Sequence, residues 1–329
     1  MGNTRNLYSE KQDILMKPFV YLTNQFLEPI IPMLIPDWNI IHGWKMASGV
    51  DQSRVVALAT TVWDQIDHSF LMQFPNLKII SHLGIGTDNI DINFLKQNHI
   101  ILHSQPNAGV HDTAELAIAL LLALSRRVIL NDRYTRNNEW VEKKPRFLGN
   151  HLLGKQLGLV GFGQIGEKIA QFAEPFGLKI AYTARSQKNS PYLYCPTAAN
   201  LASISDFLII CCSGGIDTQH LINKQVLDNL GTEGYLINVA RGSIVDQNAL
   251  IDALQRHTIA GAALDVYQYE PEVPFALRQL DNVVLSPHMG SSTKENLNQM
   301  FQLQAKHLNQ YLNEPLWQRE SHVTLFEEQ

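Results

Sequence analysis

Cysteine is scarce in this chain: only Cys195, Cys211 and Cys212 occur among its 329 residues. An odd number without the spacing of metal ligands argues against a disulfide framework and against a zinc site. Cys211 and Cys212 close an apolar segment, so we expect buried free thiols in a reducing, cytoplasmic compartment. The histidines also lack the spacing of metal ligands, and no metal site is expected.

Long hydrophobic runs and an excess of charge are missing as well. No apolar stretch reaches the roughly 20 residues that span a bilayer, and residues 1–17 lack the apolar core of a signal peptide. Charged residues make up 17% of the chain and the net charge is −5, which argues against nucleic acid or an anionic membrane as a partner. The hydrophobic content of 45% is ordinary for a globular protein, and the length suffices for two domains.

Short apolar segments alternate with helix-like segments, a pattern that predicts α/β domains with parallel sheets. The expected strands are 19–23, 38–42, 54–60, 78–82, 100–103, 157–160, 178–183, 207–212, 234–239, 260–265 and 282–286. We expect two Rossmann-like or flavodoxin-like domains with a ligand cleft between them. The substrate-binding domain would hold residues 1–104 and 294–329, and the nucleotide-binding domain residues 105–293.

One expected helix, from Asp112 or Thr113 onward, is apolar almost all round, so it should be buried between domains or subunits. Residues 126–149 are more polar and are expected to form an irregular arm. Further helices are expected at 64–74, at 246–256 with Asp246 as the N-cap, and at 293–312.

A glycine-rich turn, GFGQIG at residues 161–166, stands between an expected strand and an expected helix. This is the context of a dinucleotide-binding turn. Gly161 permits the tight turn, Gly163 lets the backbone approach a pyrophosphate, and Gly166 allows close packing of helix and strand. The first N–H groups of the helix would face the phosphates. These N–H groups belong to Gln164 and Ile165.

The end of the next strand indicates which dinucleotide is bound. NAD-binding units usually carry Asp or Glu about 20 residues past the start of the glycine motif, for the ribose 2′-hydroxyl. Residues 183–186 read TARS, so no carboxylate is available there. Arg185 offers a planar fork for a 2′-phosphate, and Ser186 offers a further donor. NADP(H) is therefore the expected cofactor, with NAD(H) as the alternative.

Polar residues follow several expected strands further along the chain. Arg241, Asp265 and His288 each stand at or just past the end of a strand, and Glu270 follows five residues after Asp265. Because the carboxyl ends of parallel strands meet at one edge of a sheet, we expect these groups to converge on one crevice. The nicotinamide ring should lie in the same crevice.

Six motifs, in order, resemble those of the D-isomer-specific 2-hydroxyacid dehydrogenase family, and within it the NADP(H)-dependent glyoxylate/hydroxypyruvate reductases. They are LGIGTDNID at 83–91, HDTAELA at 111–117, GFGQIG at 161–166, NVARGSIVD at 238–246, ALDVYQYEP at 263–271 and SPHMGSST at 286–293. The resemblance covers nearly the whole chain after Lys17. It implies an oxidoreductase that assembles as a homodimer through its nucleotide-binding domains.

The resemblance places the catalytic Arg, Glu and His of the family on Arg241, Glu270 and His288, and the chemistry of these side chains suits the roles. Arg241 can hold the carboxylate of a 2-oxo acid with paired hydrogen bonds and polarise the adjacent carbonyl. His288 can protonate the carbonyl oxygen as hydride arrives. Glu270 can hold the other ring nitrogen of the imidazole, which fixes the tautomer and favours the charged form.

The same resemblance implies several binding residues. The backbone N–H groups of Ile85 and Gly86 would bind the substrate carboxylate, in a glycine-rich turn where a ligand can touch the main chain. Asp265 would receive the nicotinamide carboxamide or else cap a turn. Thr113 would contact the nicotinamide side or else N-cap its helix. The remaining cofactor contacts fall on Cys212, Ala240, His288 and Gly290.

We therefore hypothesise NADPH-dependent reduction of small 2-oxo acids, glyoxylate or hydroxypyruvate first, to D-2-hydroxy acids. Among enzymes, the alternative is a phosphoglycerate dehydrogenase or another 2-hydroxyacid dehydrogenase that uses NAD; Ala184, where such enzymes carry an acid, weighs against it. The alternative of a different class is a cofactor-sensing corepressor, because such proteins can retain the same three catalytic-type residues.

Overall fold

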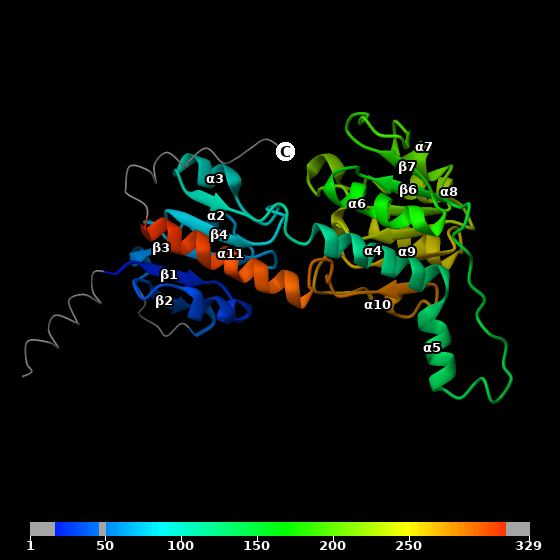
Figure 1. The fold of residues 1–329 in the computed structure, drawn as a ribbon, viewed down its shortest axis with the longest axis horizontal. Helices are drawn as coiled ribbons and strands as arrows, with labels where there is room; N and C mark the ends of the chain where they lie inside the picture. Colours follow the sequence, from blue (N-terminus) through cyan, green and yellow to red (C-terminus); the bar gives the residue numbers. More distant parts are fainter. Residues whose placement is uncertain (1–16, 46–50, 314–329) are drawn as a thin grey trace, which may run out of the picture. The chain divides into compact units, whose positions relative to one another are not determined.

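The computed structural model describes residues 17–45 and 51–313, and these form two compact units. The first unit contains the described residues up to Ala108 together with those from Lys294 onward, and the second unit is Gly109–Thr293. In the first unit the early strands, drawn in blue, and the last helix, drawn in red, pack together although they are far apart in the sequence (Figure 1). Residues 1–16, where a signal peptide was considered, lie outside the described part of the chain.

The sheet of the first unit has five parallel strands in the order β2-β1-β3-β4-β5. Their bounds are β1 Phe19–Leu22, β2 Asn39–His42, β3 Val55–Thr61, β4 Ile79–Leu83 and β5 Ile101–His103. The central strand β3 is buried almost throughout, which explains its continuous apolar sequence VVALATT. This order is that of a flavodoxin-like doubly wound sheet, in which the direction of strand addition reverses between β1 and β3.

Helices cover both faces of this sheet. They are η1 Gln25–Met33, η2 Gly43–Lys45, η3 Gln52–Arg54, α2 His68–Leu71, α3 Ile92–Gln97 and α11 Lys294–Asn313. Alternate strand residues enter separate buried clusters: Ile79 joins one and Ile80 the other, as the period of two in a strand requires. Met300 and Leu308 of α11 pack in the first of these clusters.

The helix expected over 64–74 is reduced to the single turn of α2. Asp67 caps this turn, because its carboxylate accepts the backbone N–H of Phe70 at 2.9 Å. Asp64 cannot join the helix, since its carboxylate accepts the backbone N–H of Thr61 at 2.6 Å and the side-chain amide of Asn24 at 2.8 Å. One local bond and one bond to a residue 40 positions away thus hold Asp64 outside the helix.

The sheet of the second unit has seven parallel strands in the order β12-β11-β10-β9-β6-β7-β8. Their bounds are β6 Gln156–Val160, β7 Lys179–Thr183, β8 Leu193–Tyr194, β9 Phe207–Ile210, β10 Tyr235–Asn238, β11 Gly261–Leu264 and β12 Val283–Leu285. The strand order reverses between β6 and β9, as in dinucleotide-binding sheets, and a ligand binds at such a reversal. The prediction of α/β architecture with parallel sheets is confirmed in both units.

Helices lie on both faces of the second sheet as well. They are α4 Val110–Ser125, α5 Val128–Arg136, α6 Gln164–Ala173, η4 Glu174–Phe176, α7 Ala198–Ala202, η5 Ile216–Thr218, α8 Lys224–Leu230, η6 Gly242–Ile244, α9 Gln247–Gln255 and α10 Phe275–Arg278. One buried cluster contains α4 and α6, and the other contains α7, α8 and α9. The predicted N-cap of α9 is confirmed, because Asp246 accepts the N–H groups of Asn248 and Ala249 at 3.1 Å each.

Two expectations for the start of the second unit are wrong. Helix α4 begins at Val110 rather than at Asp112 or Thr113, because Gly109 adopts a left-handed backbone (φ 70°) that sets the preceding turn. Thr113 is therefore an interior residue of the first turns and not the N-cap. Residues 126–149 are not wholly irregular, since α5 occupies Val128–Arg136.

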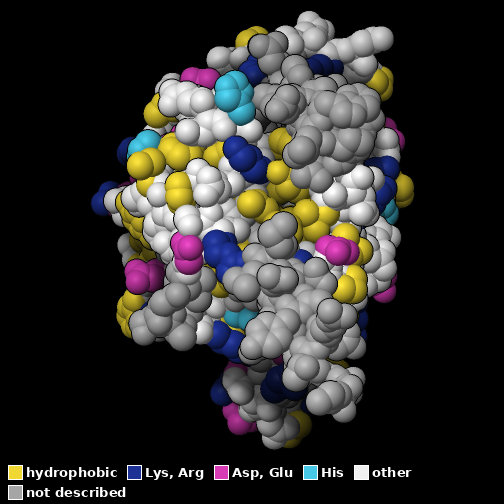
Figure 2. Space-filling model, turned by 90° about the vertical axis from the view of Figure 1, so that its left-hand side faces the viewer, with side chains coloured by type: hydrophobic (Ala, Val, Ile, Leu, Met, Phe, Trp, Pro, Cys, Tyr) yellow, Lys and Arg dark blue, Asp and Glu magenta, His cyan; other side chains and the backbone are white. Residues whose placement is uncertain are grey.

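The face drawn in Figure 2 shows charged side chains of both signs scattered around hydrophobic ones, in keeping with the small net charge of −5. Over the described residues, no helix combines the length and hydrophobicity needed to cross a membrane. No group of three or more His, Cys, Asp or Glu side chains in that part of the chain is placed to hold a metal ion.

Candidate active site

The glycine turn between β6 and α6 is shaped by steric contact. Gly161 has φ +100°, and a Cβ on it would lie 2.6 Å from the backbone N of Cys212, so only glycine fits this position. A Cβ on Gly166 would lie 2.6 Å from the carbonyl oxygen of Gly161, so Gly166 lets α6 approach the turn. Gly163 differs, because nothing lies within 4 Å of the place where its Cβ would stand.

The first turn of α6 is suited to an anion. Gly163 is its N-cap, and no side chain accepts a hydrogen bond there. The N–H groups at the start of a helix and the positive end of its dipole favour a phosphate group. The open space beside Gly163, followed by the exposed Gln164 and the partly exposed Ile165, fits the pyrophosphate of a dinucleotide.

The end of β7 carries the residues expected to distinguish the two dinucleotides. Arg185 and Ser186 are exposed at this edge, and no carboxylate occurs between Thr183 and Ser190. The turn is held by Tyr182, whose hydroxyl accepts the backbone N–H of Lys188 at 2.8 Å. The fold therefore keeps a basic, acid-free segment one strand away from the glycine turn.

The three cysteines are free thiols, as expected. Cys195 is buried, whereas Cys211 and Cys212 are partly exposed at the end of β9. The Cys211 thiol donates to the carbonyl oxygen of Gly161 at 3.1 Å. Burial raises the pKa of the Cys212 thiol to about 11, so it is protonated at neutral pH and serves as a packing group beside the glycine turn.

Arg241 follows β10 in a turn that Asn238 shapes. The buried amide of Asn238 donates to the carbonyl oxygen of Arg241 at 2.9 Å and accepts the N–H of Ala240 at 3.0 Å. The guanidinium of Arg241 donates to the carbonyl oxygen of Ala240 at 2.8 Å. Gly214 leaves room for this side chain, since a Cβ there would lie 2.8 Å from Cγ of Arg241. Asn238 was not singled out from the sequence, where it looks like an ordinary turn residue.

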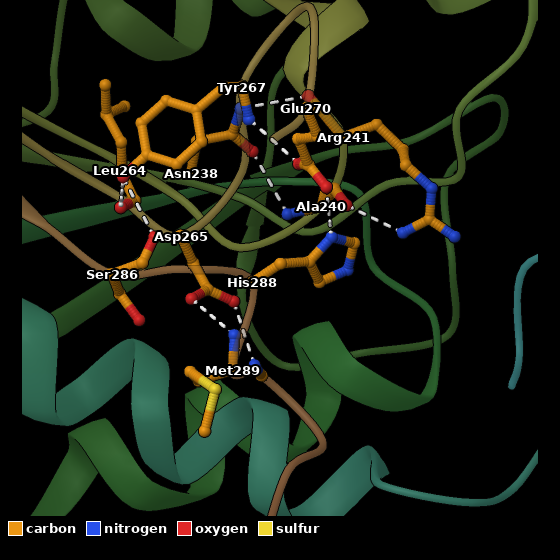
Figure 3. A network of polar contacts seen from close by, with 11 residues as sticks. Asn238, Ala240, Arg241, Leu264, Asp265, Tyr267, Glu270, Ser286, His288 and Met289 are labelled. Atoms are coloured by element: carbon orange, nitrogen blue, oxygen red, sulfur yellow. Dashed lines mark hydrogen bonds and ion pairs between the residues drawn. The ribbon is translucent and has the colours of Figure 1, made fainter. Parts of the chain in front are cut away.

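Glu270 and His288 form a close pair beside Arg241 (Figure 3). The Nδ1 atom of His288 lies 2.6 Å from Oε2 of Glu270, and Oε1 of Glu270 accepts the backbone N–H of Tyr267 at 3.0 Å. Burial acts to raise the pKa of the Glu270 carboxyl. Its hydrogen bond and attraction to His288, the Tyr267 N–H and the Arg241 charge outweigh burial and hold that pKa below its ordinary value. Glu270 is therefore an anion that holds Nδ1 and leaves Nε2 for a ligand.

Asp265 supports the backbone that carries His288. Its side chain is 1% exposed, and its two carboxylate oxygens accept the N–H groups of Met289 and Gly290 at 2.8 Å each. The N–H of His288 donates to the carbonyl oxygen of Asp265 at 2.8 Å. These bonds stabilise the left-handed backbone of His288 (φ 55°), an uncommon conformation that concentrates at functional sites. Of the two roles considered for Asp265, the capping of a turn is what the structure displays.

Tyr267 and Gly242 join these segments, and neither was singled out from the sequence. The hydroxyl of Tyr267 lies 2.9 Å from the carbonyl oxygen of Ser286 and 3.2 Å from that of Leu264. Burial raises the pKa of this hydroxyl to about 12, so it stays protonated and donates. A Cβ on Gly242 would lie 1.9 Å from the backbone of Tyr267, so glycine is required where the Arg241 turn meets the Glu270 turn.

Thr113 belongs to the same region of the second unit. A Cβ on Gly290 would lie 3.3 Å from Oγ1 of Thr113 and from Oδ2 of Asp265, which shows how closely these three residues approach. The structure thus brings together most of the predicted cofactor and catalytic residues of this unit at the carboxyl edge of its sheet. Ile85 and Gly86 belong to the first unit, in the loop that follows β4.

The fold and the site together define a class: an oxidoreductase that uses a dinucleotide. A strand–glycine turn–helix element lies at the reversal of a doubly wound sheet, and an Arg, Glu and His set follows the neighbouring strands. The comparisons with known proteins agree with this class and narrow it.

A family model described as "D-isomer specific 2-hydroxyacid dehydrogenase, NAD binding domain" matches residues 118–290. A glyoxylate/hydroxypyruvate reductase A of Arabidopsis thaliana is 43% identical over 72% of this chain and 76% of its own length. A glyoxylate reductase of Thermococcus litoralis is 39% identical over 89% of this chain and 93% of its own length.

A solved structure, that of the NADPH-dependent glyoxylate/hydroxypyruvate reductase of Sinorhizobium meliloti in complex with NADP and malonate, superimposes with a TM-score of 0.82. That protein is 32% identical, and the match covers 90% of this chain and 94% of the other. The chain belongs to the D-isomer-specific 2-hydroxyacid dehydrogenase family.

Proposed function

We propose that this protein reduces small 2-oxo acids, glyoxylate and hydroxypyruvate first, to D-2-hydroxy acids with NADPH. The observation that carries the proposal is the 2.6 Å contact between His288 and Glu270, formed beside the guanidinium of Arg241 at the carboxyl edge of a nucleotide-binding sheet. The names of the similar reductases support glyoxylate and hydroxypyruvate as the substrates.

The cofactor proposal rests on two features of the second unit. The uncapped start of α6, with open space beside Gly163, fits the pyrophosphate, and Gln164, Ile165 and Gly166 continue this cradle. Arg185 and Ser186 fit a 2′-phosphate, because a guanidinium can bind phosphate with two parallel hydrogen bonds. When bound, the reduced nicotinamide supplies the hydride. NAD(H) lacks the 2′-phosphate and would bind more weakly.

Further cofactor contacts are proposed for residues that line the same edge. Thr113, Asp265 and Gly290 approach one another closely, so a ring placed against them would meet a buried carboxylate and a hydroxyl. Cys212 and Ala240 follow β9 and β10 at the same edge of the sheet. Their side chains would pack against the cofactor, and their backbone groups would be in reach of it. His288 would contact both cofactor and substrate.

The chain's own residues would provide binding and a proton. Arg241 would hold the substrate carboxylate and draw electron density from the carbonyl, and the N–H groups of Ile85 and Gly86 would bind the same carboxylate. His288 would donate the proton on Nε2 to the carbonyl oxygen while hydride reaches C2. General-acid catalysis of this kind contributes about 10²- to 10⁴-fold in rate. Glu270 keeps Nδ1 as a donor toward itself, so the imidazole can lose only the Nε2 proton.

A direct assay tests the proposal. NADPH consumption is followed with glyoxylate, hydroxypyruvate, a branched 2-oxo acid and 3-phosphohydroxypyruvate, each as kcat/KM. We expect the first two to lead, and we expect D-glycerate from hydroxypyruvate, because glycolate is achiral and cannot report the hand of the product. A preference for 3-phosphohydroxypyruvate with NADH would indicate a phosphoglycerate dehydrogenase. No consumption with any 2-oxo acid would contradict the proposal and favour a cofactor-sensing binding protein.

We also propose a cytoplasmic homodimer. Free thiols in all three cysteines suit a reducing compartment. Between α5 and β6 the chain exposes several large apolar side chains, a surface that suits burial against a second copy. They are Trp140, Val141, Leu148 and Leu153, which are 61%, 73%, 88% and 73% exposed. Light scattering coupled to size-exclusion chromatography should give twice the chain mass of 37.1 kDa; a monomer at micromolar concentration would contradict the dimer.

A further inference from the structure

The loop after β4 presents backbone N–H groups and is rich in glycine. Gly84 has φ +148°, and Ile85 and Gly86 are partly exposed. Across residues 17–45 and 51–313, no protein acceptor takes the N–H of Ile85 or Gly86. Glycine permits many backbone conformations, so something else must keep these donors in one orientation.

Two hydrogen bonds hold the carbonyl groups on either side of these donors. The carbonyl oxygen of Gly84 accepts the backbone N–H of Gln105 at 3.0 Å. The carbonyl oxygen of Gly86 lies 3.0 Å from Nε2 of His82. In a trans peptide the C=O and N–H point in opposite directions, so the first bond sets the direction of the Ile85 N–H. The second bond fixes the peptide group that follows Gly86. With the peptide groups on both sides of the Ile85–Gly86 peptide fixed by these two bonds, the Gly86 N–H has little freedom to turn.

The chemistry of His82 suits this task. A carbonyl oxygen only accepts, so Nε2 carries the proton. Nδ1 then accepts from the hydroxyl of Thr60, whose Oγ1 lies 2.8 Å away. Both side chains are 0% exposed, so each bond replaces one to water and is costly to leave unmade. The ring also lies close to the loop backbone, since a Cβ on Gly84 would stand in van der Waals contact with Nε2, at 3.5 Å.

We propose that His82 is a positioning residue for substrate binding: anchored by Thr60, it holds the Gly86 carbonyl so that the N–H groups of Ile85 and Gly86 stay aimed as a pair at the carboxylate of a 2-oxo acid. This inference rests on the proposed function, because it assigns the carboxylate to these two donors. His82 acts through the loop and touches neither substrate nor cofactor. Its effect therefore falls on substrate affinity and leaves the proton-transfer step unchanged.

Four variants test the inference. His82→Ala removes the anchor, His82→Gln restores a donor of similar reach, and Thr60→Val removes the hydroxyl that holds the ring. Ser81→Ala is the matched control: Ser81 is also 0% exposed, and its hydroxyl donates to the carbonyl oxygen of Gln304 in α11 at 3.2 Å, away from the loop. His82→Ala and Ser81→Ala should both lower the melting temperature.

The kinetic expectations separate positioning from general stability. His82→Ala should raise KM for glyoxylate about tenfold, the loss expected of one or more misaligned hydrogen bonds to a carboxylate. Its kcat and its Kd for NADPH should stay within about twofold, since one hydrogen-bond loss confined to the loop leaves the second unit intact. His82→Gln should recover most of the affinity, Thr60→Val should give an intermediate KM, and Ser81→Ala should keep the wild-type KM.

Binding of oxalate, a two-carbon dicarboxylate, separates this inference from the proposed function because it requires no turnover. Its Kd is measured by calorimetry on the NADPH complex of wild type and each variant. Weaker binding in His82→Ala with recovery in His82→Gln supports the inference even if no 2-oxo acid is reduced. Equal KM and equal oxalate Kd in wild type and His82→Ala would overturn it, as would a rise in KM of the same size in Ser81→Ala. Should His82→Ala fail to fold, Thr60→Val and His82→Gln give the same contrast.

Discussion

The two units present polar groups at the carboxyl edge of a parallel sheet in opposite ways. In the second unit the groups that would face the substrate are the side chains of Arg241 and His288. Glu270 and Asp265 hold His288 in place and are themselves bound by backbone N–H groups: Tyr267 donates to Glu270, and Met289 donates to Asp265. In the first unit the groups proposed to face the substrate are backbone N–H groups, and the side chains proposed to support them are buried: His82 and Thr60 are both 0% exposed.

This difference teaches where function is visible in a sequence. A side chain proposed to face the substrate, such as His288, can be recognised as a candidate from its residue type alone. A backbone N–H donor cannot be recognised in this way, because every residue except proline has one. The side chain that supports such a donor looks like any other core residue in the sequence. Substitutions in the two units can test this contrast.

Replacement of a substrate-facing side chain should have the largest effect. His288→Ala removes the proton donor, so kcat should fall about 10²- to 10⁴-fold. The Kd for NADPH, measured by fluorescence titration, should change little, because the glycine turn and α6 are untouched. A turnover close to wild type would eliminate the general-acid role. It would also contradict the contrast between side-chain groups in the second unit and backbone groups in the first.

Replacement of Arg185 tests a side chain that would read the cofactor. Arg185→Asp removes the partner of a 2′-phosphate and adds a repelling charge, so the ratio of kcat/KM for NADPH to that for NADH should fall by about 10- to 100-fold. Ser186→Ala should move the same ratio less, since it removes only a neutral donor. If Arg185→Asp leaves the ratio unchanged, the 2′-phosphate role is wrong.

The glycine turn of the second unit is the place where that unit most resembles the first, because backbone N–H groups would face the ligand. Gly161→Ala forces a Cβ to 2.6 Å from the Cys212 backbone at φ +100°, so it should destabilise the fold by about 1–3 kcal/mol and abolish NADPH binding. Gly163→Ala meets nothing within 4 Å and should leave the melting temperature nearly unchanged.

The matched Gly163→Ala variant should nevertheless weaken NADPH binding, because its methyl group would enter the space proposed for the pyrophosphate. Denaturant unfolding without cofactor and a titration with NADPH measure the two effects separately. Equal loss of stability in both variants would show that the open space beside Gly163 is not a ligand site.

The smallest effect should come from the pH dependence of the Glu270 pair. Its folded-state pKa is lowered, so the ionised carboxylate contributes stability that is complete above the ordinary value of 4.5 and is lost as pH falls through the lowered pKa. Glu270→Gln cannot titrate. The difference in unfolding free energy between wild type and Glu270→Gln should therefore shrink as pH falls below 4.5. A difference that stays constant with pH would contradict the charged pairing.

Much of the fold could be predicted, because strands and caps depend on nearby residues. The apolar runs of β3 and β9 identify these strands without knowledge of the strands they pair with. Asp246 was predicted as an N-cap from its place before a helical pattern. The helix expected over 64–74 failed because Asp64 binds Asn24, a residue 40 positions away. Such a contact has no local signature.

The candidate site divides along the same line. Three parts of the site could be recognised from the sequence: the glycine turn, the residues Arg241, Glu270 and His288, and the acid-free end of β7. Their chemistry resides in side chains or in the backbone freedom of glycine. The supporting residues Asn238, Tyr267 and His82 were missed, since each bonds to a backbone carbonyl, a group that any residue could provide.

The sequence by itself determined which reactive groups this protein carries and the order in which they follow its strands, because residue type and hydrophobic periodicity are local properties. Only the tertiary structure decided which groups are held still. A buried imidazole such as that of His82, or a strand-end carboxylate such as that of Asp265, holds a loop in place only where the fold brings a backbone acceptor or donor within about 3 Å of it, the range of a hydrogen bond.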